Sequence, residues 1–435
     1  MRFKLQSLGD FYSFRKGLGY LGKYLSPSQV ALVGLNSFEG GGGYKHGGEK
    51  EYSGPYKVDH VAYPGDLFIS TTDITQDGRV LASPFLMPDM MDKYEQVIYS
   101  GDIVKAVPKK EGLSPEFLYN VLRVKFFRQK AAYASTGSTV RRIPVEVLER
   151  LEVPVPPKEI QDAIANRIGL IDRKIETNFR IAVDLEQIAQ TCFQSWFVDF
   201  DPVHAKSSGL EPEGLDIDTA GLFPDAFQES DLGDIPKGFT QVRFDSFCEV
   251  LLGGTPSKSK PDYWDGSIPW INSGAINDYR IVEATRFITE LGLGNSSCKL
   301  LPKGTTVIAI TGATLGQFSR VEIETTANQS VIGIRPFDNA FKDYVYLWVS
   351  KNIGLLTAKS TGGAQQHINR NDVCEQFVLL PPPELALKFS QVMEPIFESI
   401  SNLLFQNLTL VRLRDSLLPR LVSGDLGISD EILGE

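Results

Sequence analysis

Two long segments of the chain carry apolar residues at intervals of three and four. The first set is Ile164, Ile168, Ile171, Ile175, Phe179, Ala182, Leu185, Ala189, Cys192 and Trp196, and the second is Phe389, Met393, Ile396, Ile400, Leu404, Leu410, Leu417 and Leu421. This spacing puts apolar side chains on one face of an α-helix and is typical of a coiled-coil seam. We therefore predict long helices over 158–200 and 383–424, with Asn407 and Arg414 as polar interruptions of the second.

Proline pairs mark the approach to both helices. Pro156 and Pro157 precede the first, and Pro381 and Pro382 precede the second. Proline does not fit inside a regular helix, so Pro395 predicts a kink or a late start in the second helix. Each helix would be about 60 Å long, and neither can bury its apolar stripe alone. We expect them to pair antiparallel, which would relate the two halves of the chain by a pseudo-twofold axis.

The chain also repeats itself at an offset of 225 residues. STGSTVRRIPVEVLERLEVPVPPKE (135–159) aligns without a gap on STGGAQQHINRNDVCEQFVLLPPPE (360–384), with eight identities in twenty-five positions. The identical pairs are Ser135/Ser360, Thr136/Thr361, Gly137/Gly362, Ile143/Ile368, Val153/Val378, Pro156/Pro381, Pro157/Pro382 and Glu159/Glu384. The match exceeds what composition gives by chance, so the chain contains a duplicated unit.

A globular segment precedes each helix. Residues 1–157 and 236–382 both place a glycine turn before an apolar run (64–70 and 303–323), followed by a predicted helix (116–135 and 343–360) that leads to the STG loop. We predict an α+β fold, with two mixed α/β domains separated by the two long antiparallel helices. An acidic linker or extended loop (201–235) and an acidic tail (425–435) complete the chain.

The net charge of −10 at first argues against a nucleic-acid partner. The linker carries −8 and the tail −4, so the rest of the chain has a charge of +2. Residues 109–150 hold nine bases and four acids. This excess fits either a nucleic-acid surface or an ordinary solvated helix face.

Several polar clusters have the side chains that suit DNA. Asn, Gln and Arg form paired hydrogen bonds with base edges, whereas Ser, Thr and backbone amides suit phosphates. The candidates are Asn36, Tyr44, Lys45, His46, Ser138, Thr139, Arg141, Arg142, Gly254, Thr255, Ser257, Lys258, Trp270, Asn272, Ser273, Asn328, Gln329, Gln365, Gln366 and His367. Each cluster is equally compatible with ordinary turn chemistry. The helix-pair seam is expected at Ile164, Ile168, Ile171, Ile175, Leu185, Ile396, Ile400, Leu410, Leu417 and Leu421.

Catalytic and metal motifs are weak in this sequence. The FxGxG string at Phe38 to Gly42 has no companion Asn/Asp-Pro-Pro-aromatic element, and GGTPSKS at 253–259 lacks the glycine that a phosphate-binding loop has before its lysine. The four cysteines are more than forty residues apart, and no histidine pair has metal-ligand spacing. We expect a cytoplasmic chain with no catalytic centre, metal or cofactor of its own, and with neither a signal peptide nor a membrane span.

Three features together resemble the specificity subunits of type I restriction-modification enzymes. They are the duplicated Pro-Pro-helix unit, QSWFVDFDPVHAK (194–206) at the end of the first helix, and LFPDAFQESDLGDIPKGF (222–239) before the second globular half. GGTPS followed by YWDGSIPWINSGAIND is similar to the opening of many target-recognition domains of that family, and LRDSLLPRLVSGDL (413–426) resembles its closing element. The first half departs from this pattern, with GGGGYKHGGEKEY at 40–52.

The resemblance implies a non-catalytic subunit in which each target-recognition domain binds one half of a split DNA site. It implies that the helices set the spacing and dock two modification subunits, which methylate adenine with S-adenosylmethionine. ATP-dependent translocating and cleaving subunits, with Mg²⁺, would complete the enzyme. The alternative is a coiled-coil scaffold whose globular ends bind proteins or glycans.

Overall fold

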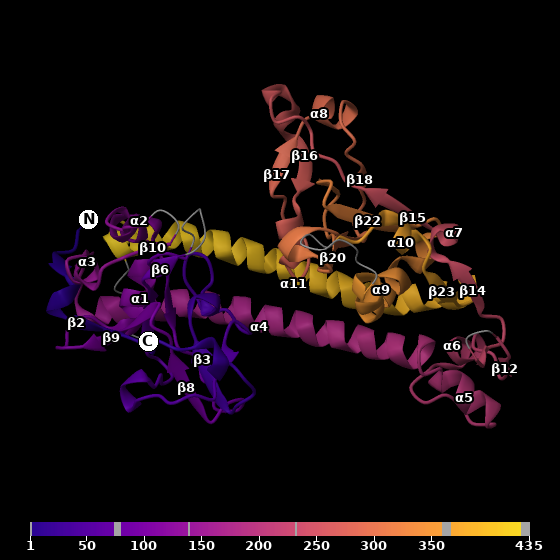
Figure 1. The fold of residues 1–435 in the computed structure, drawn as a ribbon, viewed down its shortest axis with the longest axis horizontal. Helices are drawn as coiled ribbons and strands as arrows, with labels where there is room; N and C mark the ends of the chain where they lie inside the picture. The colour runs from indigo at the N-terminus through magenta and orange to yellow at the C-terminus, as the bar shows by residue number, and fades with distance from the viewer. Residues whose placement is uncertain (1, 74–79, 138–139, 231–232, 359–366, 428–435) are drawn as a thin grey trace. The chain divides into compact units, whose positions relative to one another are not determined.

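The computed structural model describes residues 2–73, 80–137, 140–230, 233–358 and 367–427. The chain divides into two compact units (Figure 1). Unit 1 consists of Met1–Glu176 and Leu408–Glu435, and unit 2 consists of Thr177–Asn407. Among the helices of the described residues, none has the length and apolar character needed to cross a membrane.

Two long helices begin directly after the double prolines. Helix α4 covers Lys158–Phe197 and α11 covers Pro383–Ser423. Of the two outcomes expected from Pro395, the late start is wrong, because α11 begins at Pro383 and continues through Pro395, and the kink stays a prediction. Pro395 is exposed, and the helix continues through it although its ring crowds the carbonyl of the preceding turn and it has no backbone N–H to donate.

Within each unit the two helices pack in opposite directions. In unit 1, Ile164 and Ile168 near the start of α4 share a core with Leu418 and Leu421 near the end of α11. In unit 2, the Trp196 ring near the end of α4 lies 5.3 Å from that of Phe389 near the start of α11. The antiparallel helix pair is therefore confirmed, while the pseudo-twofold relation of the halves stays a prediction.

The seam residues differ in burial along the helices. Ile164, Ile168, Ile400 and Leu421 are buried, whereas Ile171, Ile175, Leu185, Ile396, Leu410 and Leu417 are half-buried. Both polar interruptions of the second stripe have partners on α4. The Nδ2 of Asn178 donates to Oδ1 of Asn407 at 3.0 Å, and Nη1 of Arg414 donates to Asp172 at 3.1 Å.

Unit 1 contains two main sheets beside its part of the helix pair. Their strand orders are β2-β9-β5-β7 and β4-β3-β8, and β3 and β8 are parallel. The elements are β1 (Leu5–Ser7), η1 (Leu8–Asp10), β2 (Tyr12–Lys16), η2 (Gly22–Tyr24), β3 (Val30–Val33), η3 (Leu35–Ser37), β4 (Lys50–Glu51), η4 (Val58–His60), β5 (Leu67–Ser70), β6 (Thr72–Asp73), β7 (Pro84–Leu86), β8 (Gln96–Tyr99), β9 (Ile103–Pro108), α1 (Pro115–Arg123), α2 (Lys125–Tyr133), β10 (Arg141–Arg142), α3 (Val145–Glu149) and β11 (Glu152–Pro154). Strand β1 pairs with β11, and β6 pairs with β10.

Unit 2 repeats this strand order, with one additional strand, β18, in its second sheet. Its main sheets are β15-β22-β19-β20 and β17-β16-β21-β18, with β16 parallel to β21, and β14 pairs with β23 just as β1 pairs with β11. The elements are α5 (Asp201–Ser207), α6 (Ile217–Gly221), β12 (Phe227–Gln228), β13 (Ile235–Pro236), β14 (Thr240–Arg243), α7 (Phe244–Phe247), β15 (Cys248–Leu252), η5 (Pro261–Tyr263), β16 (Trp264–Ile271), η6 (Ser273–Asn277), β17 (Arg286–Ile288), α8 (Glu290–Gly294), β18 (Leu300–Leu301), β19 (Thr306–Ala309), η7 (Gly312–Thr314), β20 (Phe318–Arg320), β21 (Thr325–Ala327), β22 (Val331–Pro336), η8 (Asn339–Phe341), α9 (Lys342–Ala358), α10 (Arg370–Cys374) and β23 (Phe377–Leu380). The mixed α/β fold expected from the sequence is confirmed, and the duplication is a repeat of strand order.

The acidic segment 201–235 is not an extended loop. It forms α5 and α6, and Val203 and Phe223 are buried in the same core as the end of α4. The Trp196 and Phe223 rings lie 5.1 Å apart. The composition is acidic and rich in Gly and Pro, but these apolar anchors fold the segment onto the helix end.

Candidate nucleic-acid interface

In unit 2, polar loops that are far apart in the sequence meet where the parallel strands β16 and β21 end. Asn328 N donates to Ile271 O at 2.9 Å, and Gly254 N donates to Ala327 O at 2.8 Å. Ile310 N, directly after β19, donates to Ser330 O at 2.9 Å, and Ile368 N donates to Ile310 O at 3.0 Å. We call the set Thr255, Asn272, Ser273, Asn328, Gln329, Ser330 and His367 the unit 2 junction.

Unit 1 makes the same backbone connections where β3 and β8 end. Ser100 N donates to Val33 O at 2.9 Å, and Leu18 N donates to Tyr99 O at 2.8 Å. Thr71 N donates to Asp102 O at 3.2 Å, and Ile143 N donates to Thr71 O at 2.8 Å. Ser100, Asp102 and Arg142 therefore correspond to Asn328, Ser330 and His367. We call the set Asn36, Thr72, Ser100, Asp102 and Arg142 the unit 1 junction.

A glycine permits the close backbone approach in each junction. A Cβ on Gly253 would lie 2.1 Å from Asn328 O, and one on Gly17 would lie 2.2 Å from Tyr99 O. Both glycines follow the first strand of a four-stranded sheet, β15 or β2. Any larger residue would push the polar loops apart, so the glycines position the junctions.

The unit 2 junction presents amide and hydroxyl groups together with the His367 imidazole, and it has no carboxylate. Thr255 Oγ1 is 2.5 Å from Gln329 Oε1, so the predicted GGTPSK and NQS clusters are in contact. The Oδ1 atoms of Asn272 and Asn328 accept from Ala275 N at 3.2 Å and Ser330 N at 3.1 Å. These bonds hold both carboxamides in place through their oxygen atoms. The N–H groups of the two carboxamides can then donate hydrogen bonds to acceptor atoms on a base edge.

The unit 1 junction surrounds a recess of about 320 Å³. Its lining includes all five junction residues, together with Tyr20 and Lys50. The structure thus brings together Asn36 and Arg142, two predicted DNA-binding residues more than a hundred positions apart in the sequence. The recess has room for a polar group of a ligand flanked by one acidic and two basic side chains.

Four candidate residues have structural roles instead. Trp270 is buried and donates from Nε1 to Gly254 O at 3.1 Å. A Cβ on Gly254 would lie 2.6 Å from Cys298 N, so this glycine serves packing. Tyr44 is half-buried, with its hydroxyl 3.0 Å from Glu49, and burial followed by the Glu49 charge raises its pKa. Arg141 braces the loop through Ala132 O and Ser135 Oγ at 2.9–3.1 Å.

The remaining candidates lie at the surface or outside the described residues. Lys45, His46, Ser257 and Lys258 are exposed, and the Nε2 atom of His46 lies 3.9 Å from Glu176 on α4. Ser138, Thr139, Gln365 and Gln366 fall outside the described residues. Thr72, Ser100 and Asp102 were not expected from the sequence. For Ser100 and Asp102 the correspondence is an offset of 228 between SGD (100–102) and NQS (328–330), which differs from the 225 of the helical repeat.

The basic segment 109–150 serves partly to hold unit 1 together. Arg123 is buried and forms a bidentate pair with Asp172 at 2.6 and 3.0 Å, and Lys130 lies 3.3 Å from Glu152. Phe126 on α2 is 56% exposed and Tyr133 is 95% exposed, so this helix also offers aromatic rings to solvent. Aromatic side chains interspersed with basic residues suit nucleic acid. The net charge of +5 on 109–150 is not fully available to phosphates, because some of its basic residues are paired within the unit.

Buried charges also fix the second domain to its helices. Arg280 pairs with Glu186 of α4 and, at 3.0 Å, with Glu322. Arg320 lies 3.0 Å from Asp343, which accepts from Ser390 of α11 at 2.6 Å. Burial by itself would lower the pKa of Arg280, but the neighbouring Tyr346 and the charges of Glu186 and Glu322 raise it. The network holds the β20–β21 region in one position on the helix pair.

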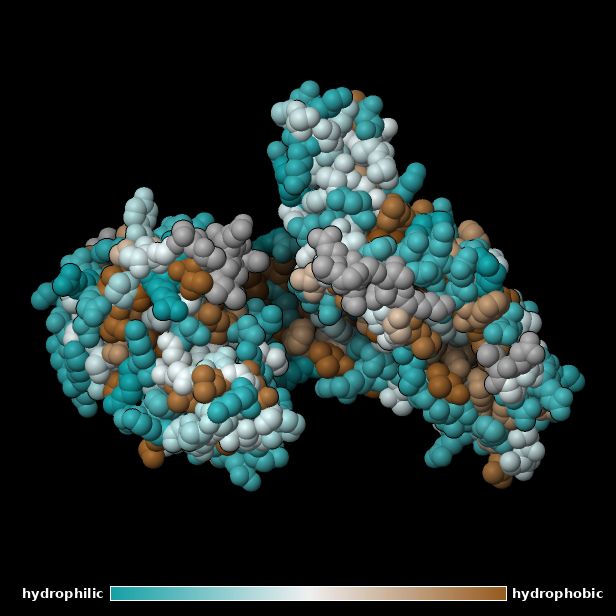
Figure 2. Space-filling view, viewed as in Figure 1, coloured by the Kyte–Doolittle hydropathy of each residue, from teal (hydrophilic) through white to brown (hydrophobic). Residues whose placement is uncertain are grey.

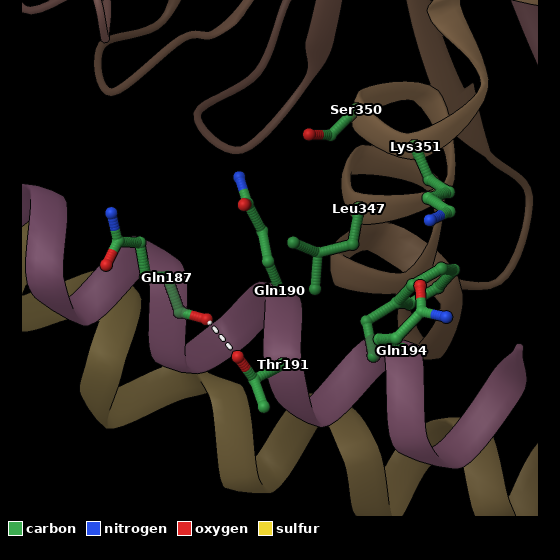
Figure 3. A pocket seen from close by; sticks show the side chains of 8 residues that line it. Gln187, Gln190, Thr191, Gln194, Leu347, Ser350 and Lys351 are labelled. Carbon is green, nitrogen blue, oxygen red and sulfur yellow. Dashed lines mark hydrogen bonds between the residues drawn. The ribbon is translucent and has the colours of Figure 1, made fainter. Parts of the chain in front are cut away.

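A polar groove lies beside this network in unit 2. It encloses about 530 Å³ between α4 and α9, and is lined by Gln187, Gln190, Thr191, Phe193, Gln194, Leu347, Ser350 and Lys351. Gln190 of α4 points toward Leu347 and Ser350 of α9, and Gln194 lies near Lys351 (Figure 3). The part of unit 2 built from β16, β17 and α8 has a mostly hydrophilic surface (Figure 2). Apolar side chains on α4 nearby are exposed, with Ile181 at 41% and Ile188 at 50%.

The sequence matches the family described as "Type I restriction modification DNA specificity domain" over residues 50–187 and 236–404. The HindI specificity subunit of Haemophilus influenzae is 26% identical, with 85% of this chain and 96% of that protein covered. The MjaIX specificity subunit of Methanocaldococcus jannaschii is 25% identical, with 74% and 71% covered.

Among solved structures, the S subunit of a type I restriction-modification system from M. genitalium has a TM-score of 0.53 to this chain, with 14% identity and 97% and 96% coverage. That likeness concerns the fold. The family match covers more than half of the chain and includes most of both junctions. The chain therefore belongs to the family of type I restriction-modification DNA specificity subunits.

Proposed function

We propose that each unit's junction recognises one half of a bipartite duplex DNA site. The observation that carries this proposal is the convergence, in both units, of separate polar loops at the ends of two parallel strands. A repeated backbone with different side chains is the arrangement expected if two similar scaffolds recognise different base pairs. The chain has no catalytic role in this proposal.

The long helices set the distance between the half-sites. A spacer of fixed length holds the two recognition surfaces at a fixed separation. This separation corresponds to a fixed number of base pairs between the half-sites, as in dimeric DNA-binding proteins. The antiparallel packing of α4 and α11 within each unit supports a rigid spacer. Lengthening or shortening both helices by the same number of residues would change the gap that is recognised.

The same helices dock two modification subunits, which methylate adenine. The exposed apolar residues Leu170, Ile181 and Ile188 on α4 and Leu387 and Leu413 on α11 support this, because exposed apolar side chains on a helix favour a protein partner. S-adenosylmethionine would bind to those subunits, and ATP and Mg²⁺ to the restriction and translocase subunits. We place the complex in the cytoplasm with its DNA.

The protein- or glycan-binding scaffold is not favoured, because the family match spans both globular ends.

The test is equilibrium binding of duplex DNA by this chain together with its modification subunits. The complex should bind one bipartite duplex at least a thousandfold, about 4 kcal/mol, more tightly than a scrambled duplex. Its affinity for both should fall with salt, because phosphate neutralisation releases counterions. Equal affinity for both duplexes at every salt concentration would contradict the proposal.

A further inference from the structure

Arg142 and Asp102, which are forty positions apart in the sequence, line one recess of the unit 1 junction. We propose that they recognise a G·C base pair in the major groove, with Arg142 bound to guanine and Asp102 bound to cytosine. This inference rests on the proposed function and specifies the base pair that the unit 1 junction selects.

Backbone hydrogen bonds fix both residues while their side chains line the recess. Arg142 N donates to Thr136 O at 2.8 Å, and Thr136 N donates back to Arg142 O at 2.9 Å. Asp102 O accepts from both N and Oγ1 of Thr71, at 3.2 and 3.0 Å. Within the described part of the chain, neither side chain forms an ion pair or a hydrogen bond with another residue. Both charged groups are therefore available to a partner outside this chain.

A carboxylate at a DNA interface has few favourable positions. It is repelled by phosphates and by the acceptor atoms of guanine, so it must face an amino group on a base edge. The arginine beside it pairs best with the O6 and N7 acceptors of guanine. A G·C pair presents those acceptors and the cytosine N4 amino group side by side, which matches one cation and one carboxylate around a single recess.

The unit 2 junction lacks this pair of charges. Ser330 corresponds to Asp102, His367 corresponds to Arg142, and Asn328 corresponds to Ser100. Carboxamides such as Asn328 suit adenine, which offers one acceptor and one donor. The same backbone thus selects a G·C pair in unit 1, and its neutral counterpart in unit 2 does not.

Lys50 of the same recess provides a matched control. Its Nζ lies 3.4 Å from Tyr20 Oη and 5.8 Å from the centroid of the Tyr20 ring. It is exposed and carries a point charge without the paired donors of arginine. Lys50 therefore suits a phosphate, and its loss should weaken binding to all sequences alike.

The experiment is selection of duplexes from a randomised pool by the complex of this chain with its modification subunits. Wild type, Asp102→Asn, Arg142→Gln and Lys50→Gln are compared after thermal unfolding shows that each is folded. In wild type, the half-site bound by unit 1 should contain a G·C pair at one position. Asp102→Asn and Arg142→Gln should each reduce the preference for that pair about tenfold, and leave the other half-site unchanged. Lys50→Gln should keep the selected sequence and lower affinity uniformly.

Three results would overturn the inference. In the first, the position whose base preference changes in Asp102→Asn and Arg142→Gln is an A·T pair in the wild-type site. In the second, the two variants alter different half-sites. A bipartite preference that neither variant alters would overturn this inference alone, and the proposed function would stand. A wild-type complex without any sequence preference would overturn both.

Discussion

At the scale of single residues, unit 1 depends on a buried ion cluster between α1, α4 and α11. The Arg123 side chain is 4% exposed and binds Asp172, which also accepts from Arg414. Burial by itself would raise the pKa of Asp172, but the hydrogen bond and charge of Arg123, with the charge of Arg414, lower it. The ionised carboxylate is therefore the form that the folded chain stabilises.

Replacing Asp172 by Asn should destabilise unit 1 by about 3 kcal/mol, because it leaves the Arg123 charge buried without its partner. The control on the same helix is Asp162→Asn, which removes an exposed pair with Lys158 and should cost less than about 1 kcal/mol. Thermal unfolding followed by circular dichroism measures both effects. Equal losses in the two variants would show that the cluster contributes no more than a surface pair.

The Asp172 contribution should also depend on pH. A carboxylate with a lowered pKa in the folded state stabilises the fold fully above its unfolded pKa, about 3.9. The stabilisation is lost as the pH falls through the lower folded value. The difference in unfolding temperature between wild type and Asp172→Asn should therefore be large at pH 7 and should shrink as the pH falls below about 3.9. A difference independent of pH would contradict this assignment.

At the scale of elements, the helix pair combines apolar packing with one buried carboxamide pair. Asn178 is fully buried and Asn407 is 9% exposed, and their side chains are hydrogen-bonded. The Oδ1 atom of Asn178 is buried without a partner. A buried polar pair costs stability and favours one register of two helices over the others.

Replacing both Asn178 and Asn407 by Leu should raise the stability of the helix pair by roughly 1–3 kcal/mol and relax its register. The complex with modification subunits should then accept half-sites at more than one spacing. Asn402→Leu, on the exposed face of α11, should change neither property. Thermal unfolding and binding to duplexes of graded spacing measure the two effects. A less stable double variant that keeps a single spacing would refute this role.

The elements also show how far the sequence could predict the structure. The helices were predictable because their apolar period runs for forty residues and begins at double prolines. The fold of 201–235 was missed, because Val203 and Phe223 stand in an acidic segment whose apolar residues show no sustained helical or strand period. Trp270 was misassigned because a sequence does not distinguish a buried indole from an exposed one. Asp102 was missed because it follows a short strand and belongs to no motif, and only the pairing of β3 with β8 brings it to the junction.

At the scale of the whole molecule, the net charge of −10 is compatible with DNA binding by a few directed contacts. The net negative charge is concentrated in 201–235 and the tail, and the bases Arg123 and Lys130 of 109–150 are paired within unit 1. We infer that this chain supplies base recognition and that its partners supply much of the phosphate neutralisation.

The central claim is that the two units each select one half of a split site. The most direct measurement is the methylation pattern of genomic DNA in a host that expresses this chain with its modification subunits. We predict one motif made of two short specific sequences, each containing a methylated adenine and separated by a fixed number of unspecified base pairs. The unit 1 variants should alter only one of the two sequences. A single uninterrupted motif, or methylation without sequence preference, would contradict the account.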